Sequence, residues 1–91
     1  MKKIKINNFK DFKQARPGQL IVYKDEYTGA TGIICQINFT SKRFLPKVFV
    51  LKHKQKSEEG KTYCWNFAVD EQAEKTTLFD ASQKITKKGN K

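Results

Sequence analysis

The chain has 91 residues, 37% of them hydrophobic, and its 19 Lys and Arg against 9 Asp and Glu give a net charge of +10. This length holds one small domain with a modest core and excludes a two-domain architecture, while the apolar content excludes a wholly disordered chain. A positive charge of this size favours polyanionic partners, with nucleic acid first among them. Since Arg16 and Arg43 are the only arginines, and lysine lacks the fork that reads guanine edges, we expect phosphate contact rather than base reading.

Residues 3–6 alternate between lysine and isoleucine and predict a short first strand. In the following stretch, NNFKDFKQA, Phe9 and Phe12 stand three apart behind Asn8, which predicts one or two capped helical turns. The sequence RPG, at residues 16–18, ends these turns.

Four segments of strand length follow, rich in β-branched and aromatic residues, at residues 19–25, 32–40, 47–54 and 62–69. Their short connections predict antiparallel hairpins. The remaining stretch is ambiguous, since DEQAEK has helix-forming residues, TTLF suits a closing strand, and Asp80 could cap a final turn through Ile85. From Thr86 onward we expect disorder.

Five or six short strands in so short a chain must bury one face of their sheet, and closing them into a barrel removes most free edges. We therefore predict a mainly β fold: a small antiparallel SH3-like barrel, or alternatively an OB-like barrel, of five or six strands with short helical turns. The predicted domain spans residues 1–85, and residues 86–91 form a disordered basic tail. Within the core, Trp65 and Phe67 are expected to pack against one face of the second long segment. That face consists of Ile33, Cys35, Ile37 and Phe39.

Signals for export, metal binding and catalysis are absent from the sequence pattern. The N-terminal residues carry early lysines but no apolar stretch of signal-peptide length, and no apolar run could span a bilayer, so we expect a cytoplasmic protein without membrane contact. Cys35 and Cys64 lack metal-ligand spacing, and we expect both thiols to be reduced and buried. With His53 as the only histidine, we expect no metal site, no cofactor and no catalytic residues, and the protein is predicted not to be an enzyme.

The stretch GQLIVYKDEYTGATGIICQI starts with a glycine, continues as an alternating strand, and turns through a polar loop with an aromatic residue into a second alternating strand. The residues that carry this pattern are Gly18, Leu20 to Tyr23, Tyr27, Gly29 and Gly32. Over residues 18 to 50 the pattern resembles the KOW motif of SH3-like small barrels, found in NusG-type elongation factors and several ribosomal proteins. The resemblance implies a small barrel in a protein that binds nucleic acid or a transcription or translation complex. In the motif this loop often carries glycine, proline and basic residues, whereas here it carries Asp25 and Glu26, so it is not expected to touch phosphate.

The net charge comes from three blocks, with +5 in residues 1–17, +5 in residues 42–61 and +4 in residues 84–91. The middle block supplies the predicted nucleic-acid-binding residues, which are Lys42, Arg43, Lys47, Lys52, Lys54, Lys56 and Lys61. The sequence LKHKQK would place its three lysines on one side of an extended strand, spaced to follow successive phosphates. The alternative is a solvated edge strand, because lysines commonly protect exposed sheet edges.

Two aromatic residues fall in predicted loops. Tyr27 is expected to be exposed and completes the predicted binding set, since an exposed ring can stack on an unpaired base. Phe44 is instead expected to close the end of the core. The GATG tetrapeptide at residues 29–32 also fits the GxxG pattern of KH domains, but it lies between two strands, so the prediction is a hairpin turn with positive φ.

The leading hypothesis is a non-catalytic nucleic-acid-binding protein that holds DNA or RNA by its phosphates without strong sequence preference. The alternative is an interaction module that binds and modulates a host enzyme or complex, such as a polymerase, a nuclease or the ribosome. Its contacts would be exposed aromatics and the acidic residues Asp25, Glu26, Asp70, Glu71 and Glu74. A third hypothesis is a ribosome-associated protein. The composition suits an accessory protein of phage or mobile-element origin, acting in the host cytoplasm if phage-encoded. The choice between DNA and RNA, and the oligomeric state, stay open.

Overall fold

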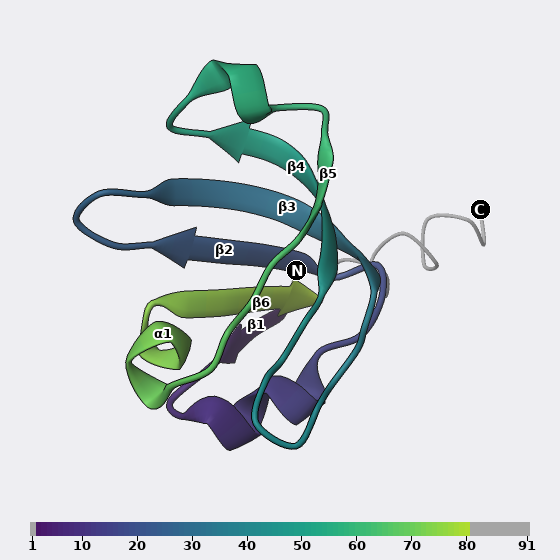
Figure 1. Cartoon of the computed structure of the whole chain (residues 1–91), viewed down its shortest axis with the longest axis vertical. Helices are drawn as coiled ribbons and strands as arrows, with labels where there is room; N and C mark the ends of the chain where they lie inside the picture. The colour runs from purple at the N-terminus through teal and green to yellow at the C-terminus, as the bar shows by residue number, and fades with distance from the viewer. Residues whose placement is uncertain (1, 81–91) are drawn as a thin grey trace.

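Runs of β-branched and aromatic residues, separated by short polar connections, form six antiparallel strands in the computed structural model, which describes residues 2–80 (Figure 1). The strands are β1 (Lys2–Lys5), β2 (Leu20–Lys24), β3 (Gly29–Gln36), β4 (Lys47–His53), β5 (Thr62–Cys64) and β6 (Thr76–Asp80). The helical elements are two 3-10 turns, η1 (Phe9–Gln14) and η2 (Lys56–Glu58), and the α-helix α1 (Asp70–Glu74). The prediction of a mainly β, antiparallel fold with short helical turns is confirmed. The predicted turn through Ile85 and the predicted basic tail at residues 86–91 lie outside the described residues.

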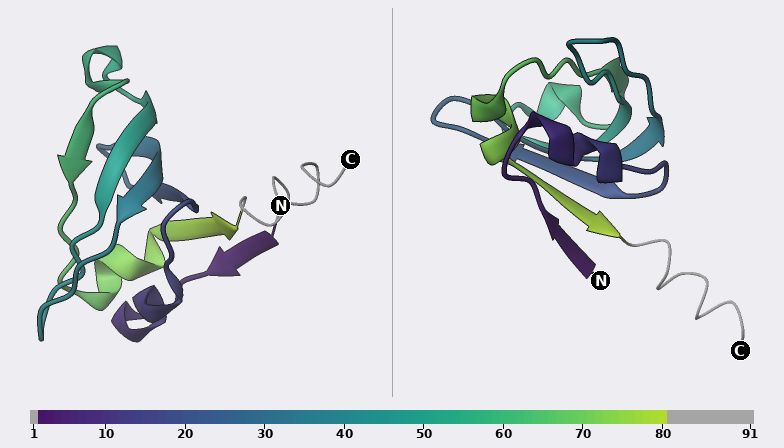
Figure 2. Two further views of the ribbon diagram at one scale, coloured as in Figure 1. Left: turned by 90° about the vertical axis from the view of Figure 1, so that its right-hand side faces the viewer. Right: turned by 90° about the horizontal axis from the view of Figure 1, so that it is seen from below.

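The strands form one sheet in the order β1-β6-β2-β3-β4-β5, and every neighbouring pair is antiparallel. Strands β2 to β5 follow one another directly, and β6 then returns beside β2. The sheet bends so strongly that β1 and β6 run crosswise to β4 and β5 (Figure 2). It is nevertheless open, because β1 and β5 are its two edges in the described chain and do not pair with each other.

A reciprocal cap fixes the start of η1. The Asn8 side chain accepts a hydrogen bond from the Asp11 amide at 3.3 Å, and the Asp11 carboxylate accepts one from the Asn8 amide at 3.3 Å. This capping box satisfies amides that a helix start leaves unpaired. The predicted helical turns behind Asn8 are therefore confirmed, and they carry Phe12 into the core, where it is fully buried.

Aromatic rings form the centre of the core. Phe12 stacks on Phe44 with ring centroids 4.5 Å apart, and the centroid of Phe67 lies 5.0 Å from that of Phe12. Phe44 comes from the β3–β4 connection and Phe67 from the segment after β5, and their backbones pair with each other. The predicted core positions of Phe44 and Phe67 are confirmed, whereas Trp65 is only partly buried beside the core.

The inward face of β3 differs from the predicted one. The buried residues of this strand are Ala30, Gly32 and Ile34. Cys35 and Phe39, which belong to the predicted face, are exposed. Alternation shows which residues share a face but not which face is buried, and a register shift past Ile34 interrupts the alternation. Both cysteines are free but exposed, so the prediction of buried thiols is wrong.

Asp25, rather than a glycine, holds the turn between β2 and β3. One of its carboxylate oxygens accepts hydrogen bonds from the amides of Tyr27 and Thr28, at 2.8 and 2.7 Å. Gly29 and Gly32 lie within β3, and neither has a positive φ. The predicted positive-φ turn at GATG is therefore wrong, because the carboxylate of Asp25 closes the turn before the first of these glycines is reached.

Glycine is nevertheless required at two positions, Gly18 and Gly32. Gly18 has a φ of 94°, which L side chains rarely adopt, and it turns the chain into β2 as the RPG sequence predicts. Gly32 permits close packing of β3 on β4. A Cβ at this position would meet the Val48 side chain and would lie 2.7 Å from the carbonyl oxygen of Phe49.

Candidate nucleic-acid interface

One face of the sheet covers the aromatic core and the other, the outer face, points away from it. The alternation of buried and accessible residues along each strand, together with the pairing register, assigns every strand position to one of the two. The paired positions of the outer face are Lys3, Lys5, Leu20, Val22, Lys24, Gly29, Thr31, Ile33, Gln36, Lys47, Phe49, Lys52, Thr62, Cys64, Thr77 and Phe79.

A bulge in β4 decides the direction of Lys52. Gly32 pairs with Val50 and Thr31 pairs with Lys52, so Leu51 is an extra residue in the ladder. In a regular strand Lys52 would point to the same side as the buried Val50. The extra residue reverses the alternation and brings Lys52 to the outer face, beside Thr31.

All charged side chains on the outer face are lysines. They are Lys3, Lys5, Lys24, Lys47 and Lys52, and each is exposed. Of the strand residues in the described chain, only Asp80 is acidic, and it shares its side of β6 with the buried Leu78. Within residues 2–80 none of these five lysines forms a side-chain hydrogen bond or ion pair. Their charges are therefore available to an anionic partner.

An apolar strip crosses the middle of this face. Phe79, Leu20, Ile33 and Phe49 lie in register on β6, β2, β3 and β4, so each contacts the next across the ladder. Lys3 continues the row on β1. At the usual separation of strands the two phenylalanines stand about 14 Å apart. Phe49 is 36% exposed and is the most accessible ring of the strip.

The seven basic residues predicted from the sequence lie in three places. Lys47 and Lys52 are on the outer face. Lys54, Lys56 and Lys61 surround η2 at the top of Figure 1, where Lys54 Nζ donates to the carbonyl oxygen of Tyr27 at 3.4 Å. Lys42 and Arg43 lie in the β3–β4 connection at the bottom of Figure 1, beside η1.

This distribution corrects one detail of the predicted cluster. Strand β4 ends at His53, and Lys56 starts η2, so Lys56 does not continue a row with Lys52 and Lys54. Lys52 lies on the outer face, whereas Lys54 follows the end of β4 and Arg43 donates to Asn66 Oδ1 at 3.0 Å in the β3–β4 connection.

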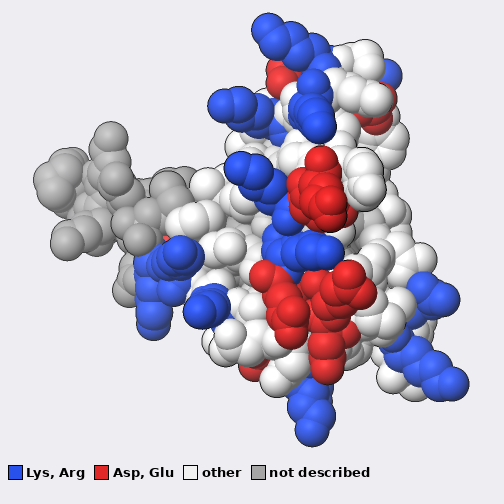
Figure 3. Space-filling model, turned by 90° about the vertical axis from the view of Figure 1, so that its left-hand side faces the viewer, with Lys and Arg blue, Asp and Glu red and all other residues white. Residues whose placement is uncertain are grey.

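Tyr27 is 81% exposed, as predicted, but its surroundings are acidic. It follows Asp25 and Glu26 in the β2–β3 turn, which lies on the left side of Figure 1, as does α1. The Lys24 amide donates to the Lys75 carbonyl oxygen at 3.1 Å and joins the end of β2 to the end of α1. The acidic end is formed by Asp25, Glu26, Asp70, Glu71 and Glu74, and Figure 3 shows carboxylates in the middle of this side with lysines between and around them.

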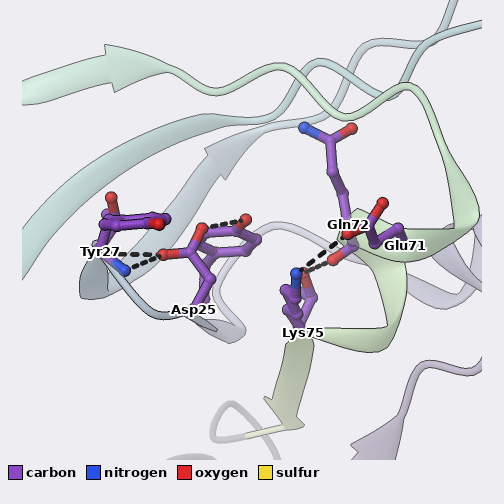
Figure 4. A network of polar contacts seen from close by, with 8 residues as sticks. Asp25, Tyr27, Glu71, Gln72 and Lys75 are labelled. Atoms are coloured by element: carbon purple, nitrogen blue, oxygen red, sulfur yellow. Dashed lines mark hydrogen bonds and ion pairs between the residues drawn. The ribbon is translucent and has the colours of Figure 1, made fainter.

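Local hydrogen bonds hold the carboxylate of Asp25, and Figure 4 shows them together with the ion pair between Lys75 Nζ and Glu71 Oε2 at 3.4 Å. Burial, together with the hydrogen bond that its hydroxyl donates to Asp25 at 2.7 Å, raises the pKa of Tyr23 from 10.0 to about 12. The same hydroxyl, followed by the amides of Thr28 and Tyr27, lowers the pKa of Asp25. The turn thus keeps a carboxylate at neutral pH, which repels phosphate.

A cleft of about 350 Å³ opens between this end and the segment after β5. Its walls include Tyr23, His53, Trp65 and Gln72. Two of its polar side chains accept hydrogen bonds from backbone amides. His53 Nδ1 accepts from the Gln55 amide at 2.9 Å, and Gln72 Oε1 accepts from the Ala68 amide at 2.7 Å. In the described part of the chain no group of three or more His, Cys, Asp and Glu could hold a metal ion.

No helix within residues 2–80 is long and apolar enough to cross a membrane. No family model, curated protein or solved structure matches the chain. The fold and its two charged regions define the chain as a small antiparallel β protein with a lysine-bearing outer face and an acidic end.

Several outer-face residues are not among those predicted from the sequence. Lys3 and Lys5 are visible as the polar positions of the first alternating strand, and Phe49 as the middle of the VFV sequence. Phe79 gives no such signal. Its position beside Leu20 depends on β6 pairing with β2, a contact between residues far apart in the chain.

Proposed function

We propose that this protein is a non-catalytic nucleic-acid-binding protein that holds the phosphate backbone of DNA or RNA on the outer face of its sheet. The observation that supports this proposal best is that every charged side chain on that face is an exposed lysine. Lysine is a point charge suited to phosphate and gives little base discrimination, so binding is largely independent of sequence. The proposed location is cytoplasmic, or the cytoplasm of a host if the protein is phage-encoded.

Binding of this kind is driven by the release of counterions from the nucleic acid. If all five outer-face lysines contact phosphates, the logarithm of the association constant falls with the logarithm of salt concentration with a slope of about −3.5 to −4.5. The residues beyond the sheet, at Lys42, Arg43, Lys54, Lys56 and Lys61, would extend the contact to longer nucleic acids.

The test is a salt titration of binding to labelled single-stranded DNA, duplex DNA and structured RNA, followed by fluorescence anisotropy. We expect salt-sensitive binding to at least one of them. Absence of retention on all three probes at low salt would refute the proposal.

The second candidate function is an interaction module, favoured by the way the fold joins the acidic residues of the β2–β3 turn to those of α1 beside an aromatic cleft. This surface suits a basic segment of a partner protein such as a polymerase, a nuclease or the ribosome. The test is affinity capture after nuclease digestion, with the chain and with its E26K/E71K variant. Partners that survive digestion and are lost with the variant favour this function, and co-sedimentation with ribosomes at moderate salt examines the ribosomal case.

A further inference from the structure

The outer face contains more than duplex binding requires. Contact with the phosphates of a double helix needs cations and little else. Here the lysines surround an apolar strip with a phenylalanine ring at each end, and Phe49 exposes 36% of its surface. In a duplex the faces of the bases are stacked on each other, so nothing in it would cover these rings.

A single strand has the complementary chemistry. Its unpaired bases present flat π faces that stack on aromatic side chains, while its phosphates need the same lysines as before. Phe49 lies on β4 between Lys47 and Lys52, so one strand of the sheet carries a ring with a cation on either side. The bulge at Leu51 is what puts the second cation on the same side as the ring.

A second copy of the chain fits this face poorly. Self-association through the outer face would bring five lysines against five lysines with no carboxylate on either side to compensate. The charge of the face therefore argues for a polyanion with apolar surfaces of its own.

We infer that the outer face binds single-stranded nucleic acid in preference to duplex, with unpaired bases stacked on Phe49 and phosphates held by Lys47 and Lys52. This inference rests on the proposed function and specifies its substrate. Phe79 extends the platform at the other end of the strip, about 14 Å away by strand spacing.

The test compares three labelled probes of equal phosphate count: an oligothymidylate, the same oligomer built from abasic units, and a duplex. The whole chain should bind the oligothymidylate more tightly than the abasic strand or the duplex. Phe49→Ala should weaken oligothymidylate binding by about 5- to 150-fold, the range measured for loss of one stacked base, and should leave the abasic strand unchanged. Phe49→Trp should retain the preference, because it keeps a ring.

Tyr27→Ala is the matched control, since it removes a ring that is 81% exposed at the acidic end. It should change none of the three affinities. Equal binding of base-bearing and abasic strands, or an equal loss on both with Phe49→Ala, would overturn the inference while leaving phosphate binding intact. Failure of all three probes to bind would instead refute the proposed function itself, and a loss confined to Tyr27→Ala would move the stacking site away from the outer face.

Discussion

The outer face and the acidic end are made by adjacent residues of the same chain, yet they have opposite charge. Lys24 is the last residue of β2 and belongs to the outer face, and Asp25 follows it in the turn. The difference lies in what the charged groups do. Asp25 accepts hydrogen bonds from backbone amides, and Asp70 likewise accepts from the amide of Phe9 at 2.8 Å. These two carboxylates therefore stabilise the fold, whereas the lysines of the outer face are exposed to solvent and to partners.

The largest effect is expected from a change in the aromatic core, which lies beneath both the outer face and the acidic end. Phe12→Ala deletes the ring that stacks on Phe44 and leaves a cavity in the core. We expect the free energy of unfolding to fall by about 3–5 kcal/mol. Urea denaturation followed by circular dichroism measures this, with Phe12→Leu as a control that retains most of the volume. Unfolding at the wild-type midpoint would contradict the described core.

The next prediction separates the outer face from net charge alone. The K47E/K52E variant should lower affinity for nucleic acid on the order of 50-fold at about 0.1 M salt and reduce the salt slope by about two. K10E/K13E changes the net charge equally but acts on exposed residues of η1. Anisotropy titrations of both variants measure whether K47E/K52E loses more affinity for nucleic acid than K10E/K13E does. An equal loss in both would mean that binding follows total charge and has no preferred face.

A third prediction concerns the close packing of β3 on β4, the two strands that carry Ile33 and Phe49 of the outer face. Gly32→Ala places a Cβ against Val48 and the Phe49 carbonyl oxygen, which pushes β4 away from β3. We expect a loss of about 1–3 kcal/mol in unfolding free energy, measured by chemical denaturation. Gly29→Ala is the matched control in the same strand, because its Cβ would meet nothing within 4 Å. Similar stability of the two variants would contradict the close packing at Gly32.

The smallest effect concerns the acidic end. Since the folded chain raises the pKa of Tyr23 from 10.0 to about 12, Tyr23 contributes stability that is fully present below pH 10 and is lost as the pH rises to about 12. Asp25→Asn should lower the pKa of Tyr23 but leave it above 10.0, because burial is the larger cause. Tyrosinate absorbance measures the titration, with Tyr23→Phe to assign it. Unchanged titration in Asp25→Asn would show that the hydrogen bond has no influence.

The pH dependence of stability that Asp25 contributes runs in the opposite direction to that of Tyr23. Its pKa is lowered in the folded chain, so its contribution to stability is present above the unfolded pKa and is lost as the pH falls through the folded value. Acid denaturation of the wild type and of Asp25→Asn should therefore converge at low pH. A difference that persists in acid would contradict this linkage.

Local sequence was sufficient for most elements and for the charge. The cap at Asn8, the positive φ of Gly18 and the alternation of the strands each depend on a few neighbouring residues, so they could be recognised without a structure. The prediction of the buried face of β3 is wrong, because burial depends on which side of the strand the rest of the chain covers. Likewise the predicted row of three lysines does not reach Lys56, because β4 ends at His53.

The sequence by itself determined a basic, mainly β protein built from short alternating strands. Only the tertiary structure decided that Lys52 shares a face with Phe49, that Phe79 joins their apolar strip, and that two separate acidic segments meet at one end. The physical reason is that alternation has a period of two residues and is read locally, while register, bulges and pairing are fixed by partner strands far away in the chain.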